Sequence, residues 1–164
     1  MQEDYFSGIT KSVAETKKIA SMLAREIAAK PSGKARVIAL NGNLGAGKTT
    51  FTQGFARALG ITDRIQSPTF VLMKIYSLKR KKNLKHLIHI DAYRIEKLRE
   101  IEHLGLRELL NDKDAVILIE WADRIKKILP KDTIWVHFKH GKGIHERIII
   151  LRSSYIMSLV NNAE

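Results

Sequence analysis

Hydrophobic and polar positions near the start of the chain repeat with the period of a helix. One face collects the apolar residues Ile19, Met22, Leu23 and Ile27, which recur three or four positions apart. Ser12-Val13-Ala14-Glu15 has the pattern of a capping box, and Lys30-Pro31-Ser32-Gly33 interrupts the repeat. We therefore expect an amphipathic helix between these two boundaries, preceded by a short strand at Tyr5-Phe6.

The rest of the chain alternates between strand-like and helix-like patterns. Apolar runs predict strands at residues 36–40, 70–78, 84–90, 115–119, 133–138 and 147–151. Helical spacing predicts helices at residues 49–59, at 95–110 with a break at Gly105, and at 121–129, where Pro130 ends the pattern. The wholly apolar run 115–119 is typical of a parallel strand covered on both faces. Strands 70–78 and 84–90, and strands 133–138 and 147–151, are each expected to form an antiparallel hairpin.

These elements predict an α/β fold, with a mixed parallel and antiparallel sheet flanked by helices. The 164 residues suit one domain, which we place at residues 1–151, followed by a C-terminal tail at residues 152–164. Cysteine is absent, which excludes disulfides and thiolate metal sites and agrees with a reducing cytoplasm. No apolar run approaches the ~18 residues of a membrane span and no secretion signal is visible, so we expect a cytoplasmic protein without membrane contact.

The segment from Gly42 to Thr49, GNLGAGKT, fits the P-loop pattern G-x-x-x-x-G-K-[ST] between a predicted strand and a predicted helix. Glycines let main-chain N–H groups approach phosphate oxygens, and the following helix N-terminus completes an anion cradle. Lys48 is expected to reach the β- and γ-phosphates, and the Thr49 hydroxyl is expected to bind Mg²⁺. The segment therefore predicts a nucleoside triphosphate site. Adenine is favoured because the N-K-x-D element of guanine-specific proteins is missing.

A P-loop enzyme needs an acidic residue at the end of a second strand to hold its metal ion. Two candidates exist, because one predicted strand leads to Asp91 and another leads to Glu120. Either acid alone could instead cap the turn that follows its strand. The phosphates and Mg²⁺ need a partner, so we expect at least one of the two acids to act at the site, as a metal ligand or in orienting the attacking water.

Four motifs occur in a fixed order, and together they resemble the TsaE family, also called YjeE. They are Gly42 to Thr50 (GNLGAGKTT), Ser67-Pro68-Thr69-Phe70, His89-Ile90-Asp91-Ala92-Tyr93-Arg94 and Ile119-Glu120-Trp121. The resemblance implies a compact P-loop domain that binds ATP and Mg²⁺ and hydrolyses ATP slowly by itself. It also implies a role beside TsaD and TsaB, which transfer threonylcarbamoyl to adenosine 37 of tRNAs that read ANN codons. Contact with tRNA would then be indirect, and the free protein is expected to be a monomer.

The resemblance also implies roles for single residues. Lys48, Asp91 and Glu120 are implied catalytic residues, and Thr49, Asp91 and Glu120 are implied metal ligands. Thr69 resembles a switch residue that senses the γ-phosphate, and Trp121 lies beside the site. The implied nucleotide-binding residues are Asn43, Leu44, Gly45, Ala46, Gly47, Lys48, Thr49, Thr50, Thr69 and Trp121. Asn43 departs from the family, where aspartate is common, but the cradle there is main chain and little effect is expected.

The net charge of +12 and one basic loop leave a nucleic-acid role open. The loop from Lys79 to Lys85 holds five basic residues in seven, so it is a candidate for direct tRNA contact. No aromatic residue in it could stack a base, and a solvated hairpin tip is the favoured alternative. The six histidines show no zinc-binding spacing.

Two other functions compete with the ATPase. The first is a P-loop kinase for a small molecule, for which we see no obvious arginine-rich lid. The second is a nucleic-acid-binding module that uses the positive charge and not the P-loop.

Overall fold

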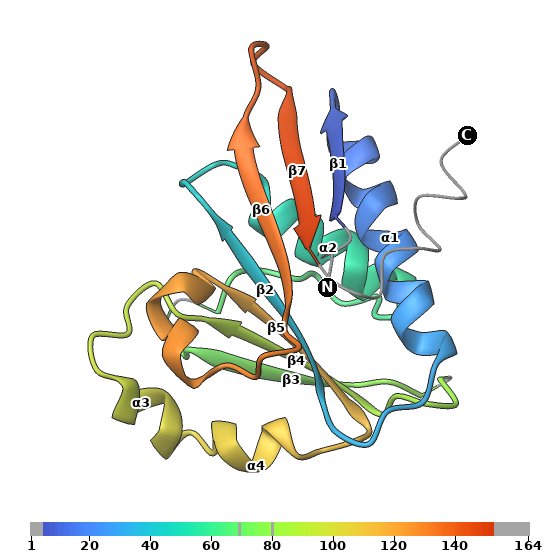
Figure 1. Cartoon of the computed structure of the whole chain (residues 1–164). Helices are drawn as coiled ribbons and strands as arrows, with labels where there is room; N and C mark the ends of the chain where they lie inside the picture. The colour runs from blue at the N-terminus through green and yellow to red at the C-terminus, as the bar shows by residue number, and fades with distance from the viewer. Residues whose placement is uncertain (1–4, 69, 80, 153–164) are drawn as a thin grey trace.

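The protein folds around one seven-stranded sheet, shown in the computed structural model in Figure 1, which describes residues 5–68, 70–79 and 81–152. The strands are β1 (Tyr5–Thr10), β2 (Arg36–Gly42), β3 (Met73–Ser77), β4 (His86–Asp91), β5 (Ala115–Glu120), β6 (Ile134–His140) and β7 (Arg147–Arg152). Their order across the sheet is β1-β7-β6-β2-β5-β4-β3. The four central strands are parallel, whereas β3 at one edge and β7 and β1 at the other are antiparallel to their neighbours. The predicted mixed sheet and both predicted hairpins are confirmed.

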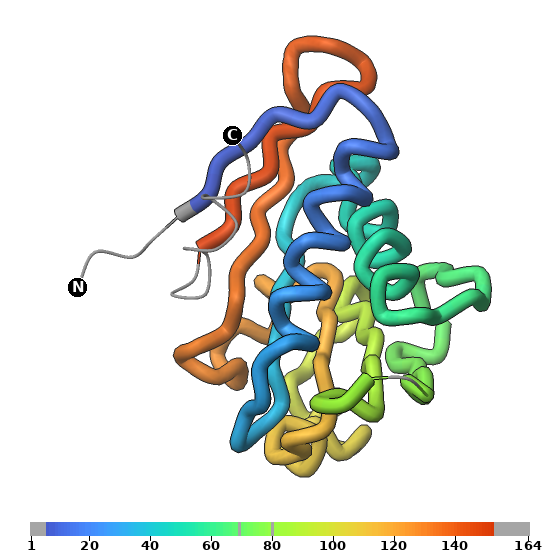
Figure 2. Tube along the Cα trace, turned by 90° about the vertical axis from the view of Figure 1, so that its right-hand side faces the viewer, coloured from blue at the N-terminus to red at the C-terminus, as the bar shows by residue number. Residues whose placement is uncertain are grey.

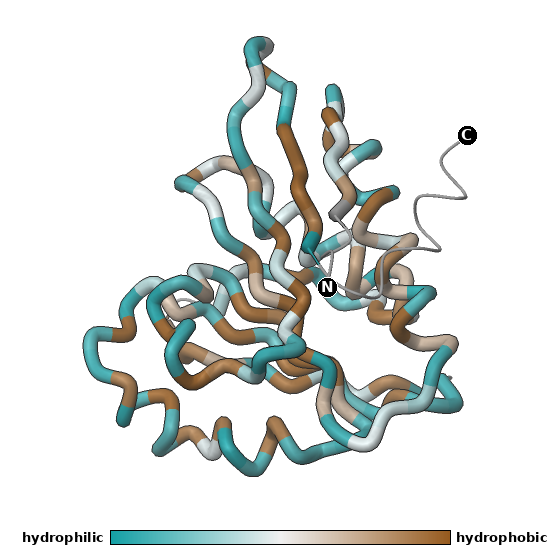
Figure 3. Tube along the Cα trace, viewed as in Figure 1, coloured by the Kyte–Doolittle hydropathy of each residue, from teal (hydrophilic) through white to brown (hydrophobic). Residues whose placement is uncertain are grey.

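Helices cover both faces of this sheet. α1 (Val13–Ala29) and α2 (Lys48–Ala58) pack on one face, over a core that includes Phe51, Phe55 and the inward side chains of the strands. The short helices α3 (Leu98–His103) and α4 (Leu106–Leu110) and the 3-10 helix η1 (Ala122–Ile128) pack on the other face. Figure 2 shows α1 and α2 side by side, and Figure 3 shows apolar stretches along the strands and in the helices that cover them. All six residues of β5 are buried, as expected for a parallel strand covered on both faces.

The first helix forms where the sequence predicts it. Its N-cap is Ser12, whose hydroxyl accepts a hydrogen bond from the backbone N–H of Glu15 at 3.1 Å. The Glu15 carboxylate does not return to the cap itself, since it accepts from the backbone N–H of Lys11 at 2.7 Å. The helix ends at Ala29, just before Pro31. The strand before it, β1, has six residues and not only the two that were predicted.

Two predicted elements differ from the structure. Residues 70–72 form a turn in place of the start of a strand, because the backbone N–H groups of Val71 and Leu72 both donate to the Pro68 carbonyl. β3 therefore begins only at Met73. Residues 122–128 form 3-10 turns with a kink at Ile125 and not a regular helix. Trp121, directly after β5, caps them in a left-handed conformation (φ 56°).

The remaining boundaries differ by a few residues. The predicted helix 95–110 is split into α3 and α4 at Gly105, as expected from that glycine, and it starts at Leu98. Of the predicted tail at residues 152–164, Arg152 ends β7 and the rest lies outside the described residues. Among the described residues, no helix combines the length and the apolar character that crossing a bilayer requires.

Candidate functional site: the P-loop and the strand-end carboxylates

The P-loop joins the end of β2 to the start of α2, the connection that an anion cradle needs. Gly47 caps α2 with φ 108°, a conformation that residues with a Cβ atom rarely adopt. Gly42 is required for a different reason, since a Cβ there would lie 2.6 Å from the carbonyl oxygen of Phe138 on β6. The amide groups in the first turn of α2 have no acceptor within the helix and are free to face an anion.

A pocket of about 470 Å³ opens beside this loop. Its lining consists of Leu44, Gly45, Gly47, Lys48, Thr49, Thr50, Ser67, Asp91, Tyr93, Glu120 and Trp121. The structure therefore brings together most of the predicted nucleotide-binding, catalytic and metal-binding residues. Asn43 and Ala46 belong to the loop itself, where the Ala46 backbone N–H donates to the Asn43 carbonyl at 3.1 Å. Thr69, the predicted switch residue, lies outside the described residues, and its role stays a prediction.

The two predicted acids lie next to each other at one edge of the sheet. Asp91 ends β4 and Glu120 ends β5, and these parallel strands pair with Asp91 opposite Glu120. Both residues are only 2% exposed. Because the carboxyl ends of parallel strands share one edge, the fold delivers both carboxylates to the mouth of the P-loop.

Glu120 is held by three side chains. Its Oε2 accepts a hydrogen bond from the Thr49 hydroxyl at 3.1 Å. Its Oε1 lies 2.9 Å from Nε2 of His89 and 3.3 Å from the Thr52 hydroxyl. Thr52 also donates to the carbonyl oxygen of Lys48 at 3.0 Å, which ties the carboxylate to the first turn of α2. Glu120 therefore has a fixed orientation toward the P-loop.

Asp91 is held by the segment that precedes β3 and by the residues that follow β4. Its Oδ2 accepts a hydrogen bond from the Ser67 hydroxyl, and its Oδ1 accepts one from the backbone N–H of Tyr93 at 2.9 Å. Tyr93 also packs against Trp121, with ring centroids 4.9 Å apart. One wall of the pocket is thus formed by two aromatic rings beside two carboxylates.

The Lys48 ammonium group lies within the loop and against an aromatic ring. It donates to the carbonyl oxygens of Gly42 and Asn43, the latter at 2.9 Å, and it lies 4.0 Å from the centre of the Trp121 ring. Burial lowers the pKa of Lys48 from its ordinary value, and the negative charges of Glu120 and Asp91 oppose that shift. A cation that is partly stripped of water interacts strongly with an anion that enters the pocket.

Hydroxyl and carboxylate oxygens are the ligands that Mg²⁺ prefers, so Thr49, Asp91 and Glu120 fit this ion when a triphosphate supplies further oxygens. By themselves, the described residues contain no group of three or more histidine, cysteine or acidic side chains placed to hold a metal ion. The chemistry of these ligands therefore suits a metal that arrives with a phosphate ligand.

The sequence reasoning missed His89, Ser67 and Tyr93 as members of the site. His89 is completely buried and contacts Glu120, although the histidines were considered only as zinc ligands. A signal was present, because residues two apart on a strand share a face and His89 precedes Asp91 by two positions. Ser67 and Tyr93 stand in the quoted motifs, but only the structure shows that both contact Asp91.

The basic loop is partly tied to the fold. Lys85 forms an ion pair with Asp114 at 2.7 Å, and this contact raises the pKa of Lys85 and lowers the pKa of Asp114. Leu84 is completely buried in the core beneath α1 and α2. The Asn83 amide donates to the carbonyl oxygen of Ala28 at 3.1 Å. Among the residues described in this loop, Lys79, Lys81 and Lys82 remain as candidates for contact with a polyanion.

Comparison with known proteins decides the family. The family described as "Threonylcarbamoyl adenosine biosynthesis protein TsaE" matches residues 10–149. The chain is 43% identical over 140 residues to the tRNA threonylcarbamoyladenosine biosynthesis protein TsaE of Bacillus subtilis, covering 85% of this chain and 80% of that one. The chain belongs to the TsaE family. A TsaE protein of Rickettsia prowazekii is 39% identical over 129 residues, covering 78% of this chain and 82% of its own.

A solved structure agrees with this TsaE assignment. The crystal structure of Bacillus subtilis YdiB matches the fold with a TM-score of 0.75 and 33% sequence identity, covering 98% of this chain and 95% of that one. The family takes part in the biosynthesis of threonylcarbamoyladenosine in tRNA. The resemblance inferred from the four sequence motifs is confirmed.

Proposed function

We propose that this TsaE-family protein is a cytoplasmic, Mg²⁺-dependent ATPase that acts with TsaD and TsaB in the threonylcarbamoyl modification of adenosine 37. The observation that carries the ATPase proposal is the convergence of Lys48, Asp91 and Glu120 on one pocket beside the P-loop. A loop that cradles anions, a buried lysine and two buried carboxylates are the parts that phosphoryl transfer requires.

The proposed roles follow from the contacts. The P-loop amides and Lys48 bind the phosphate chain, and Lys48 offsets the negative charge that develops on the β–γ bridging oxygen as its bond to the γ-phosphorus breaks. Thr49, Asp91 and Glu120 would hold Mg²⁺, and the ion when bound would supply further positive charge beside the phosphates. Water attacks the γ-phosphorus and ADP departs, so the protein itself forms no covalent bond.

His89 has a positioning role in this scheme. His89 would contact neither the nucleotide nor the metal ion, because it is buried behind Glu120. Its Nε2 lies 2.9 Å from the carboxylate Oε1. Such a contact from behind a ligating carboxylate fixes the direction in which its oxygens point. The Thr52 hydroxyl contacts the same oxygen, and the Thr49 hydroxyl contacts the other one, so the orientation of Glu120 depends on three neighbours.

The test of the proposed function is ATP turnover with TsaD and TsaB present. We expect Asp91→Ala and Glu120→Ala each to lower turnover at least about 100-fold, as expected for groups that position a metal and its water. Asp132→Ala is the matched control, because this exposed acid pairs with Lys34 away from the pocket. Wild-type turnover in both site variants would refute the assignment.

Two further measurements test the competing kinase function and the proposed partners. Screening nucleosides and small metabolites for a phosphorylated product would identify a kinase. Pull-down of TsaD and TsaB under ATP, ADP and no nucleotide tests the partner proposal, and we expect capture to depend on the nucleotide. Equal capture, or no capture, under all three conditions would contradict a nucleotide-controlled role in that assembly.

A further inference from the structure

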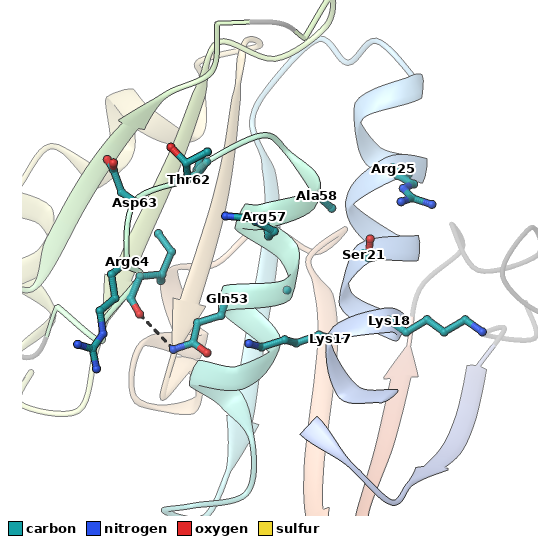
Figure 4. Close-up of a pocket in the computed structure, with 13 residues that line it drawn as sticks. Lys17, Lys18, Ser21, Arg25, Gln53, Arg57, Ala58, Thr62, Asp63 and Arg64 are labelled. Atoms are coloured by element: carbon teal, nitrogen blue, oxygen red, sulfur yellow. Dashed lines mark hydrogen bonds between the residues drawn. The ribbon is translucent and has the colours of Figure 1, made fainter. Parts of the chain in front are cut away.

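A second cavity, larger than the nucleotide pocket, lies between α1 and α2. This basic groove has a volume of about 720 Å³ and is bounded by the two helices and by residues 61–65. It is lined by Lys17, Lys18, Ser21, Arg25, Gln53, Gly54, Arg57, Ala58, Ile61, Thr62, Asp63, Arg64 and Ile65. Figure 4 shows Lys17 reaching from α1 toward Gln53 on α2, whereas the Lys18 side chain projects from α1 away from α2. None of the described residues that line the groove also lines the pocket beside the P-loop, which is called the nucleotide pocket below.

The groove carries a large excess of positive charge. Five lysine and arginine side chains line it, against the single carboxylate of Asp63. Within the described part of the chain, none of these five cations lies in an ion pair, although other surface lysines such as Lys34 and Lys85 do. Unneutralised cations gathered around a concave surface attract an anion more strongly than the same charges spread over a flat surface.

The walls of the groove are fixed by the packing of the two helices. A Cβ atom at Gly54 would lie 2.7 Å from the Cα atom of Lys17, so the helix backbones approach each other closely at this point. The Gln53 side-chain amide donates to the carbonyl oxygen of Ile65 at 3.2 Å, which holds residues 61–65 against α2 (Figure 4). The base of Lys17 is therefore fixed on one wall, and Arg57 and Arg64 extend from the other two.

The lining suits phosphate groups better than it suits a protein partner. Arginine guanidinium groups bind phosphate oxygens in a bidentate manner, and Ser21, Gln53 and Thr62 add neutral hydrogen-bonding groups. Among the residues that the structure describes, no aromatic residue lines the groove, and the two isoleucines in its lining, Ile61 and Ile65, are buried. Protein interfaces usually have an apolar, aromatic centre, and a site that reads bases usually offers rings for stacking. Contact with a sugar–phosphate backbone needs neither.

We propose that the basic groove binds the phosphodiester backbone of RNA, and specifically of a tRNA. This inference rests on the role of the TsaE family in tRNA modification and on the groove, and it is independent of the proposed ATPase activity. This groove is distinct from the loop from Lys79 to Lys85, between β3 and β4, which is the candidate for RNA contact that the sequence alone indicates. The second half of α2 lines the groove, whereas its first turn lines the nucleotide pocket.

The test compares two triple variants of the full chain that change the net charge equally. Lys17→Glu, Arg57→Glu and Arg64→Glu together reverse three charges in the groove. Lys113→Glu, Lys127→Glu and Lys131→Glu together reverse three exposed charges outside it, on the α4–β5 connection, on η1 and on the turn after it. Binding of a labelled, unmodified tRNA is measured between 50 and 200 mM KCl, conditions chosen to reveal the salt dependence of phosphate contacts (~10³-fold for six contacts).

We expect the groove variant to bind tRNA at least about tenfold more weakly than the wild type. The slope of log affinity against log salt concentration should decrease in magnitude by about 2 to 3. The control variant should stay within about threefold of the wild type. A second variant with glutamine at the same three groove positions should lose affinity by a smaller factor, and thermal unfolding checks that each variant is folded.

Equal weakening in the groove and control variants, or unchanged binding in the groove variant, would overturn the proposal. Unchanged tRNA binding together with lost capture of TsaD and TsaB would show an acidic protein partner in place of RNA. ATP turnover should remain at the wild-type level in the groove variant, so a failure of this proposal and a failure of the ATPase proposal give different results.

Discussion

The proposed nucleotide pocket and the basic groove meet along one helix, α2, yet they are built in opposite ways. In the pocket, the charged groups are buried and neighbouring polar side chains hold them in place, as Thr49, Thr52 and His89 do for Glu120. In the groove, Arg57, Arg64 and Lys18 are exposed, and each extends from its backbone into solvent without an ion-pair partner among the described residues. The pocket therefore holds its side chains in fixed positions, whereas the groove gathers exposed positive charges.

This difference decides what each region can do. Phosphoryl transfer needs groups that are fixed before the substrate arrives, and buried hydrogen bonds provide that order. Attraction of a polyanion tolerates mobile side chains, because it depends on the number of phosphates neutralised more than on their exact positions. Substitutions in the pocket should therefore affect turnover, and substitutions in the groove should affect salt-dependent binding.

The largest predicted effect comes from Lys48→Ala. We expect ATP turnover to fall at least about 100-fold, because the variant removes a partly desolvated cation from beside the phosphates. The affinity for tRNA should change by less than about twofold. Lys48 is buried in the pocket, and its loss could remove no more than one phosphate contact. Steady-state kinetics and tRNA titration of the same preparation check both values. A parallel loss of tRNA binding would show that the two regions form one site.

The second prediction concerns the contact between the helices that form the groove. Gly54→Ala should lower the free energy of unfolding by about 2 kcal/mol, because the added methyl group would overlap the backbone of Lys17. Gly33→Ala is the matched control, since no atom lies within 4 Å of a Cβ at that position. The control should shift stability by less than about 1 kcal/mol. Urea unfolding measures both, and equal effects would contradict the close approach of α1 and α2.

The third prediction concerns the support behind Glu120. His89→Ala should lower turnover about tenfold and raise the Mg²⁺ concentration needed for half-maximal turnover, because the carboxylate loses a neighbour that orients it. His89→Gln keeps an N–H donor and should recover part of this loss. A residue that served only the stability of the fold would not change the Mg²⁺ dependence, so an unchanged Mg²⁺ requirement in His89→Ala would exclude the positioning role.

The smallest predicted effect is at His137, which lies on β6 in neither region and provides a baseline for pH effects. Burial lowers the pKa of His137 below its ordinary value of 6.5, and the positive charges of Arg152, Lys126 and Lys139 add to the shift. The unfolded chain therefore binds this proton more tightly, and stability falls as pH decreases through about 6.5. His137→Gln should reduce the loss of Tm between pH 7 and pH 5 by about 2 °C or less. An identical acid sensitivity in the variant would exclude this histidine as a cause.

Much of the nucleotide pocket could be predicted because its parts are local in sequence. The P-loop is one continuous segment, and each acid follows its own apolar strand. The sequence could not place Thr52 and His89 against Glu120, because those contacts span 68 and 31 positions. The turn at residues 70–72 was also missed, since Phe70 and Val71 have the composition of a strand, yet they are exposed in a turn set by the Pro68 carbonyl.

The groove could not be predicted from the sequence in the same way. Its cations come from α1, from α2 and from the segment after α2, and no motif joins Lys17 to Arg64. The packing of α1 on α2, with its close approach at Gly54 and Lys17, and the contact of Gln53 with Ile65 bring them around one cavity. A run of basic residues such as the loop from Lys79 to Lys85 is visible in a sequence, whereas a cluster assembled by the fold is not.

The most direct measurement of the proposed ATPase site is calorimetric titration with a non-hydrolysable ATP analogue, with and without Mg²⁺. The wild type should bind the analogue at least about tenfold more tightly when Mg²⁺ is present, because Thr49, Asp91 and Glu120 then hold the ion against the phosphates. A variant carrying both Asp91→Asn and Glu120→Gln should still bind the nucleotide but lose that increase. Two results would contradict the assignment of these two carboxylates to the metal. They are a wild-type affinity for the analogue that does not change with Mg²⁺, and an Mg²⁺-dependent increase in affinity that is still present in the double variant.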